Sequence, residues 1–230
     1  INYPILNYQK CFDGCFVFGE KEAIHNYLIP GGIPSNDKLK EYKNIPKQHL
    51  LIITNFLGNK PTYTDPWGFH FLPMDEHFFN GLGLLDLQEK YKKPIVIKIK
   101  SREDGNYTED INYIKSLLPE ELNYEIIVDV EDDNLLISQS EVVIGHPSTM
   151  MLKPLQLGIP TVMFKNYGYG DEGSCIYGEC KELIEFDYNK MVKTLEISPN
   201  PQLIQKLTSG GIDFTSIDHY IHYINQIING

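Results

Sequence analysis

Ser148 and Thr149, in the sequence GHPST (145–149), have the type and position best suited to binding an anion. They follow the apolar run EVVIG (141–145), which reads as a buried strand, and open STMMLKPLQLG (148–158), which reads as a helix. Free backbone amides at a helix N-terminus favour a phosphate, and the two hydroxyls add hydrogen bonds. The alternative is an ordinary N-cap, because Ser or Thr begins many helices that bind no ligand.

Basic side chains collect at the end of a second predicted strand. PIVIKIK (94–100) carries Lys98 and Lys100, and Arg102 follows in the next loop. Parallel strands end at the same edge of a sheet, so this basic group is expected near GHPST, where it would neutralise a phosphate. Lysines at a strand edge are also often simply solvated, and that interpretation stays open for Lys100.

A third loop supplies small and polar residues. HLLIITNF (49–56) reads as a buried strand, and the loop that begins TNFLGNK (54–60) contains Asn55 and Gly58. Glycine permits a close approach of backbone to phosphate. The same glycine can equally serve only the turn.

The long segment TYTDPWGFHFLPMDEH (62–77) holds the candidates for proton transfer, Asp65 and His70. Either side chain can act as a general base when it lies within hydrogen-bond distance of a hydroxyl. A lone histidine in a loop is also commonly a surface residue. The single tryptophan, Trp67, suits either sugar stacking or simple packing.

The elements that must position these residues alternate along the chain. Short apolar strands at 94–100, 124–130, 141–145 and 160–164 are accompanied by helical segments such as 76–92, 109–118, 132–140 and 189–197. SIDHYIHYINQII (216–228) has isoleucines at helical spacing, whereas residues 29–48 read as an irregular connector. We expect an α/β protein with a doubly wound, mainly parallel sheet and helices on both faces.

The composition of the chain narrows the class of partner. The 230 residues carry a net charge of −11, which argues against a nucleic acid or an anionic membrane as the main partner. No apolar run is long enough to span a membrane, and no signal peptide is evident, so a cytoplasmic location is predicted. The four cysteines lack the spacing of a zinc site and are expected to be reduced thiols.

These motifs together resemble a known family. SEVVIGHPSTMMLKPLQLGIPTVMF (140–164), after a strand that ends in lysines, is similar to the donor-binding C-terminal half of GT-B glycosyltransferases. The nearest types are the capsule and CDP-glycerol transferases and the similar UDP-N-acetylglucosamine 2-epimerases. The resemblance covers roughly residues 15–180 and is most specific at 140–164.

The resemblance implies roles for individual residues. Ser148 and Thr149 would contact the diphosphate of a nucleotide sugar, and Gly58 would let the first loop approach it. The further candidate donor contacts are Asn55, Lys98, Lys100, Arg102 and His146. Asp171 or Glu172, in the loop GYGDEG (168–173), would bind sugar hydroxyls, unless this loop is only a solvated acidic turn.

The sequence also departs from that family. The motif Lys-Pro-His-Pro is absent, and His146 lies in the later motif, so it is not the equivalent of the family's histidine. The acidic residue that many relatives use to bind a ribose is missing from MMLKPLQLG (150–158). EDD (131–133) resembles a helix start more than a metal-binding Asp-x-Asp motif, so neither a metal nor a cofactor is expected.

A complete GT-B enzyme has two such domains, whereas this chain fits one half. We expect a lead-in at 1–45 and a nucleotide-sugar-binding α/β domain at 46–230. The predicted function is transfer of a sugar, UDP-linked in the first instance, to a hydroxyl acceptor during glycan biosynthesis. The alternatives are an epimerase-like enzyme and a non-catalytic subunit that needs an acceptor-domain partner or neighbouring domain. Such a subunit would be recognisable by an exposed apolar face formed by Phe69, Phe71, Phe78 and Phe79.

Overall fold

The centre of the protein is a six-stranded sheet in which every strand pairs in parallel with its neighbours. The computed structural model describes residues 15–17, 28–54, 63–64, 70–71, 76–99, 107–128, 130–165, 177, 180–209 and 211–229. The sheet comprises β3 (His49–Ile53), β6 (Ile95–Lys98), β7 (Tyr124–Ile127), β8 (Ser140–Gly145), β9 (Thr161–Phe164) and β10 (Leu183–Ile184).

The strand order is β10-β9-β8-β3-β6-β7, the doubly wound order of Rossmann-like folds. The chain starts in the middle at β3, adds β6 and β7 on one side, and then returns to build β8, β9 and β10 on the other. The point where the order reverses therefore lies between β3 and β8. The predicted fold class is confirmed.

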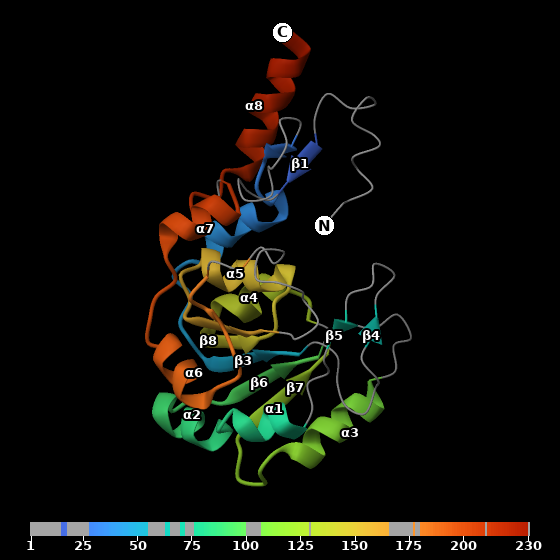
Figure 1. Cartoon of the computed structure of the whole chain (residues 1–230), viewed down its shortest axis with the longest axis vertical. Coiled ribbons are helices and arrows are strands. Elements are labelled where there is room, and N and C mark those ends of the chain that lie inside the picture. Colours follow the sequence, from blue (N-terminus) through green and yellow to red (C-terminus); the bar gives the residue numbers. More distant parts are fainter. Residues whose placement is uncertain are drawn as a thin grey trace.

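Helices cover both faces of this sheet (Figure 1). One face carries α1 (Glu76–Gly81), α2 (Leu84–Tyr91), α3 (Thr108–Leu117) and α6 (Tyr188–Thr194). The other carries α4 (Asp133–Ser138), α5 (Leu152–Gln156) and α7 (Pro201–Leu207).

Strand β3 illustrates why the strands are apolar throughout. Leu50 and Ile52 pack in the core under α1, α2, α3 and α6, whereas Leu51 and Ile53 pack in the core under α4, α5 and α7. All residues of β3 are buried. A central strand covered on both faces needs apolar side chains at successive positions, which is the pattern seen in its sequence.

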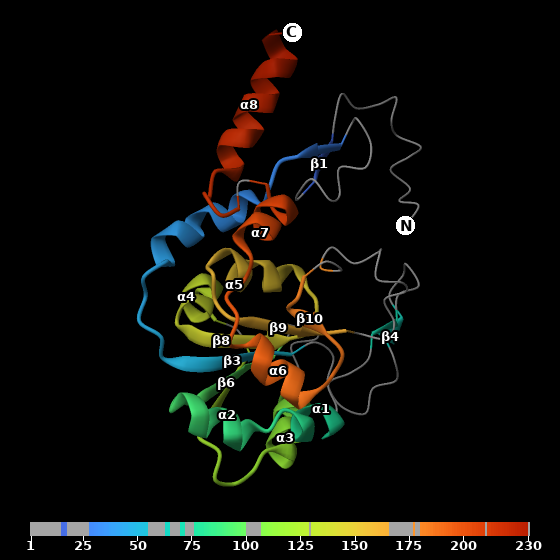
Figure 2. The same ribbon diagram turned by 60° about the vertical axis from the view of Figure 1, so that its left-hand side comes forward.

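The C-terminal helix α8 (Ser216–Asn229) extends away from the sheet, as Figures 1 and 2 show. Its first turn is fixed by Asp37, whose carboxylate accepts hydrogen bonds from the backbone amides of Ser216 at 3.1 Å and Ile217 at 2.8 Å. Asp37 belongs to the 3-10 helix η2 (Pro34–Tyr42). The prediction of an irregular connector was therefore wrong for these residues, which form a helix that holds α8.

Two small strand pairs lie outside the central sheet. β1 (Cys15–Val17) and β2 (Leu28–Pro30) pair in parallel, and β4 (Tyr63–Thr64) and β5 (His70–Phe71) pair antiparallel. None of the described helices is long and apolar enough to cross a membrane.

Local details differ from the predicted elements. The helix expected at 76–92 is split into α1 and α2, and Gly83 between them has a positive φ of 56°. The helix expected at 148–158 begins as a 3-10 turn, η3 (Thr149–Met151), before α5. The short strand β10 and helix α7 were not predicted, because a strand of two residues and a helix of seven residues give little periodic signal.

Candidate functional site

The carboxyl edge of the sheet brings three of the predicted segments together. Gly145, Ile53, Lys98 and Ile127 are paired in one row across β8, β3, β6 and β7. Neighbouring strands are about 4.8 Å apart, so the end of β8 lies about 10 Å from the end of β6. In doubly wound folds, ligands bind outside this edge where the strand order reverses, here between β3 and β8.

Gly145 ends β8 where it approaches β3. A Cβ at this position would lie only 2.8 Å from the backbone oxygen of Ile53, so a side chain there requires the two strands to move apart. The next residue, His146, has Nδ1 3.1 Å from the backbone oxygen of Phe164. A carbonyl only accepts, so Nδ1 carries the hydrogen. The His146 ring also packs against Phe78, with centroids 5.4 Å apart, which orients the start of the turn.

Ser148 and Thr149 are both exposed at this edge. Ser148 has an extended backbone, and its carbonyl accepts hydrogen bonds from the Tyr177 hydroxyl at 2.6 Å and the Met151 amide at 2.9 Å. Its side chain makes no capping hydrogen bond to the helical turn. The ordinary N-cap interpretation therefore does not describe Ser148, whose hydroxyl is not used by the helix that follows.

Lys98 is buried at the end of β6. Its ammonium Nζ lies 3.5 Å from Asp133 Oδ1 and 3.5 Å from the backbone oxygen of Val128. The sequence suggested a basic group facing a phosphate, whereas the structure places this charge beside a carboxylate of α4. Its contact with a donor stays a prediction.

Asp132 is the N-cap of α4 and uses both carboxylate oxygens. Oδ1 accepts hydrogen bonds from the amides of Asn134 at 2.9 Å and Leu135 at 3.1 Å, and Oδ2 accepts one from the Tyr42 hydroxyl at 2.6 Å. The Tyr42 hydrogen bond, with the amides, lowers the pKa of Asp132. The interpretation of EDD (131–133) as a helix start is confirmed.

Lys153 joins the same group of charges from α5. It is partly buried, and this desolvation lowers the pKa of its ammonium, with Lys98 acting in the same direction while Asp133 and Asp132 oppose it. In the sequence, the helix after Ser148 was noted only for lacking an acidic residue. Lys153 is visible there as a basic residue, but its position beside α4 depends on packing.

The remaining candidates divide between described and undescribed parts of the chain. His70 lies in β5, although the position of its side chain is not described. The candidates outside the described residues are Asn55, Gly58, Asp65, Lys100, Arg102, Asp171 and Glu172. Within the described residues, no three His, Cys, Asp or Glu side chains form a group able to hold a metal ion.

Phe78 and Phe79 do not form an exposed face. They are 5% and 2% exposed and belong to the core under α1, so the expectation for these two residues was wrong. A helix that covers a sheet buries the aromatic side chains on its inner face. The other pair expected there, Phe69 and Phe71, has no described side chain.

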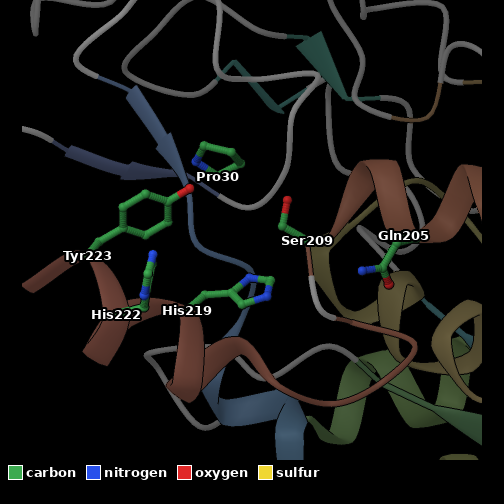
Figure 3. Close-up of a pocket in the computed structure, with 6 residues that line it drawn as sticks. All are labelled: Pro30, Gln205, Ser209, His219, His222 and Tyr223. Carbon is green, nitrogen blue, oxygen red and sulfur yellow. The ribbon is translucent and has the colours of Figure 1, made fainter. Parts of the chain in front are cut away.

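A separate cavity of about 320 Å³ lies at the base of α8 (Figure 3). Its lining comes from the ends of β2 and α7 and from α8: Pro30, Gln205, Ser209, His219, His222 and Tyr223. None of these residues belongs to the row at the carboxyl edge of the central sheet.

Comparison with known proteins gives matches in structure only. A scan against protein-family models found no match, and neither did a search of curated proteins. UDP-GlcNAc 2-epimerase from Neisseria meningitidis bound to UDP-GlcNAc has a TM-score of 0.53 and 15% identity, covering 96% of this chain and 67% of the epimerase.

Two further solved structures are similar to this chain to the same degree. UDP-GlcNAc 2-epimerase from Methanocaldococcus jannaschii with UDP-GlcNAc and UDP has a TM-score of 0.51 and 15% identity, over 92% of this chain and 61% of that protein. S. aureus MnaA with UDP has a TM-score of 0.53 and 13% identity, over 93% of this chain and 60% of MnaA. This chain therefore spans less than two thirds of these two proteins. Such low identity establishes fold alone, and the fold is that of one Rossmann-like half of a GT-B protein.

Proposed function

We propose that this chain binds a nucleotide sugar at the carboxyl edge of its sheet and serves as the donor-binding half of a glycosyltransferase. The observation that carries the proposal is the turn after β8. It presents the exposed Ser148 and Thr149 beside the point where the strand order reverses, and the Ser148 hydroxyl is not used as a cap. This is where doubly wound folds hold phosphorylated ligands.

In this proposal, the protein accelerates transfer mainly by holding the donor and stabilising the leaving diphosphate. The hydroxyls and amides at Ser148 and Thr149 bind the phosphates, and the basic group of Lys98, Lys100 and Arg102 offsets their charge. Asn55 and Gly58 bring the first loop against the same phosphates, and His146 orients the turn. Asp171 or Glu172 bind the sugar.

The proposed reaction joins the anomeric carbon of the sugar to an acceptor oxygen while the bond to the diphosphate breaks. His70 or Asp65 takes the proton from the acceptor hydroxyl, and the bond electrons leave with the diphosphate. A UDP-sugar is the first donor to test, because the epimerase and MnaA structures with the same fold were determined with UDP or UDP-GlcNAc.

A second proposal concerns a partner domain that carries the acceptor site. Along α8, Ile217, Ile221, Ile224 and Ile228 are 49%, 53%, 45% and 73% exposed in the part of the chain that the structure describes. They follow one another at intervals of 4, 3 and 4 residues, which aligns them on one side of the helix. A helix that presents such an apolar stripe is suited to pack against another domain, which favours the need for a partner.

The test of nucleotide binding is a thermal-shift screen against UDP, GDP, CDP, CMP and dTDP, followed by calorimetry. A ligand at a hundredfold its dissociation constant stabilises the fold by about 2.7 kcal/mol. We expect at least one nucleoside diphosphate to bind and the double variant Ser148→Ala, Thr149→Ala to lose about 100-fold in affinity. Ser116→Ala, an exposed serine on α3, is the matched control and should bind normally.

Product analysis with the corresponding nucleotide sugars distinguishes a transferase from an epimerase and from a subunit that only binds the donor. Transfer to a hydroxyl acceptor supports a transferase, a free epimer supports an epimerase, and binding without turnover supports a subunit that needs its partner. If none of the nucleotides binds, the whole proposal is contradicted.

A further inference from the structure

Asp132 and Asp133 are neighbours at the start of α4 but differ in the use of their carboxylates. Asp132 uses both oxygens within the fold, with two amides on Oδ1 and the Tyr42 hydroxyl on Oδ2. Asp133 accepts no hydrogen bond from any described residue. Among the described residues, the ion pair of Asp133 is with Lys98, whose Nζ lies 3.5 Å from Oδ1. Asp133 therefore retains hydrogen-bonding capacity that the cap itself does not need.

The two oxygens of Asp133 also differ in their surroundings. Oδ1 is buried beside Lys98, whereas the side chain as a whole is 33% exposed, so its accessible part lies elsewhere than at Oδ1. Lys98 is only 7% exposed and holds the inner side of the carboxylate. A buried ammonium fixes the orientation of an acid that it faces, because separating the two charges leaves one of them uncompensated. Because Oδ1 is buried, Oδ2 is the oxygen that a ligand would contact.

The strand register places this carboxylate on the same edge as the turn with Ser148. Lys98 is paired with Ile53, and Ile53 with Gly145, so the two ends lie two strands apart, about 10 Å. A nucleotide with its phosphates at Ser148 and Thr149 can extend along this edge toward α4. In Rossmann-like folds, an acidic side chain near the strand ends commonly binds the ribose hydroxyls of such a ligand.

We propose that Asp133 binds the ribose hydroxyls of the nucleotide and that Lys98 is the positioning residue that holds its carboxylate. This inference rests on the proposed nucleotide binding and adds the recognition of the ribose. The helix α5, which follows the phosphate-binding turn, has Lys153 and no acid, so α4 supplies the carboxylate instead. Lys153 balances the charge of the two aspartates.

The test compares UDP, GDP and CDP, each with its 2′,3′-dideoxy form, by calorimetry on the wild-type chain and on Asp133→Asn. A hydrogen bond to a charged group contributes about 1.5–3 kcal/mol, so the wild type should prefer the ribose form by about 10- to 100-fold. In Asp133→Asn this preference should fall to within about twofold, because the neutral amide makes no charge-assisted hydrogen bond to the ribose and no ion pair with Lys98.

Controls separate this inference from the proposed function. Glu131→Gln removes one exposed acid from the same segment and should keep the full ribose preference, and circular dichroism checks that each variant is folded. An unchanged ribose preference in Asp133→Asn overturns the role of Asp133 while leaving nucleotide binding in place. Binding of none of the three nucleotides by the wild type overturns both.

A separate measurement tests whether Lys98 acts by positioning Asp133 or by contacting the phosphates. If Lys98 acts through Asp133, Lys98→Met lowers the ribose preference, and Lys98→Arg restores it. A direct effect of Lys98 on the phosphates cancels from this preference, because both forms of each nucleotide carry the same diphosphate. A loss of pyrophosphate affinity with an intact ribose preference would instead assign Lys98 directly to the phosphates and overturn its positioning role.

Discussion

Among the residues that the structure describes, the two edges of the central sheet differ in their polar side chains: Lys47 and His49 at the amino edge bond within the fold, whereas some at the carboxyl edge do not. At the amino edge, His49 Nε2 lies 3.1 Å from both Ser140 Oγ and the backbone oxygen of Leu136. Lys47 Nζ donates to the backbone oxygen of Ser138 at 2.7 Å, and Lys93 Nζ to that of Lys47 at 2.8 Å. These side chains form hydrogen bonds that join the ends of strands and helices.

At the carboxyl edge, Asp133 has no described hydrogen-bond donor and Ser148 does not cap its helix. Polar groups that already bond within the fold gain little from a ligand, whereas groups without a partner in the fold can exchange water for a ligand and gain the net energy of a hydrogen bond. The comparison therefore indicates that the amino edge contributes stability, and it is consistent with the proposal that the carboxyl edge binds the ligand.

The largest effect on stability is expected at Gly145, where the two central strands meet. Gly145→Ala puts a Cβ 2.8 Å from the Ile53 oxygen, and overpacking of this kind costs about 1–3 kcal/mol. The free energy of unfolding from urea titration measures it. Gly158→Ala is the comparison, because its Cβ meets no atom within 4 Å and the cost there comes only from the positive φ of 70°, about 1 kcal/mol. Equal losses at both glycines would show that close strand approach is not the cause.

The next effect contrasts one serine from each edge. Ser140 is fully buried and its hydroxyl donates to the Leu136 oxygen at 3.1 Å, so Ser140→Ala should lower the free energy of unfolding by about 1–2 kcal/mol. Ser148→Ala should change it by less than about 0.5 kcal/mol, because Ser148 is exposed.

Nucleotide affinity should respond in the reverse order, with Ser148→Ala weakening binding and Ser140→Ala leaving it unchanged. Urea titration and calorimetry on the two variants provide both numbers. If Ser140→Ala weakened binding as much as Ser148→Ala, the division of labour between the edges would be contradicted.

A smaller effect is expected from the pH dependence of His49. Burial lowers the pKa of this imidazole below its ordinary value of 6.5, opposed by the backbone contact at Leu136 and by Glu125, with Lys47 and Lys93 adding to the lowering. The unfolded chain then binds a proton more readily than the folded protein. The contribution of neutral His49 to the free energy of unfolding is therefore fully present above about pH 6.5, and it is lost as the pH falls below that value.

Urea titrations from pH 8 to pH 5 on the wild type and on His49→Gln measure this dependence. The wild type should lose more of its stability over that range than the variant does, because the variant cannot take up this proton. His222→Gln, on the exposed side of α8, is the control and should follow the wild type. Parallel curves for wild type and His49→Gln would rule out His49 as the source.

Much of the fold could be predicted because it depends on neighbours in the sequence. The apolar runs at β3, β6, β8 and β9 were recognisable as buried strands, and the isoleucine spacing predicted α8. The helix start at Asp132 was also local, since a cap binds amides two and three residues ahead. The 3-10 helix η2 was not recognisable, because its stability comes from its contacts with α4 and α8.

The candidate site was predictable in part for the same reason. Residue types at the strand ends indicated Ser148, Thr149 and Lys98, and the parallel sheet implied one shared edge. The role of Asp133 had no signal of its own, because two adjacent aspartates look alike until their partners are known.

The sequence by itself determined that this is an α/β protein with a hydroxyl-bearing turn between a strand and a helix. Only the tertiary structure decided the strand order, the burial of Phe78 and Phe79, and the pairing of Lys98 with Asp133. It also decided which aspartate has both oxygens hydrogen-bonded within the fold, because the hydroxyl that binds Asp132 belongs to Tyr42, 90 residues away. Periodicity and capping are set by adjacent residues, whereas burial and hydrogen-bond partners are set by contacts between distant ones.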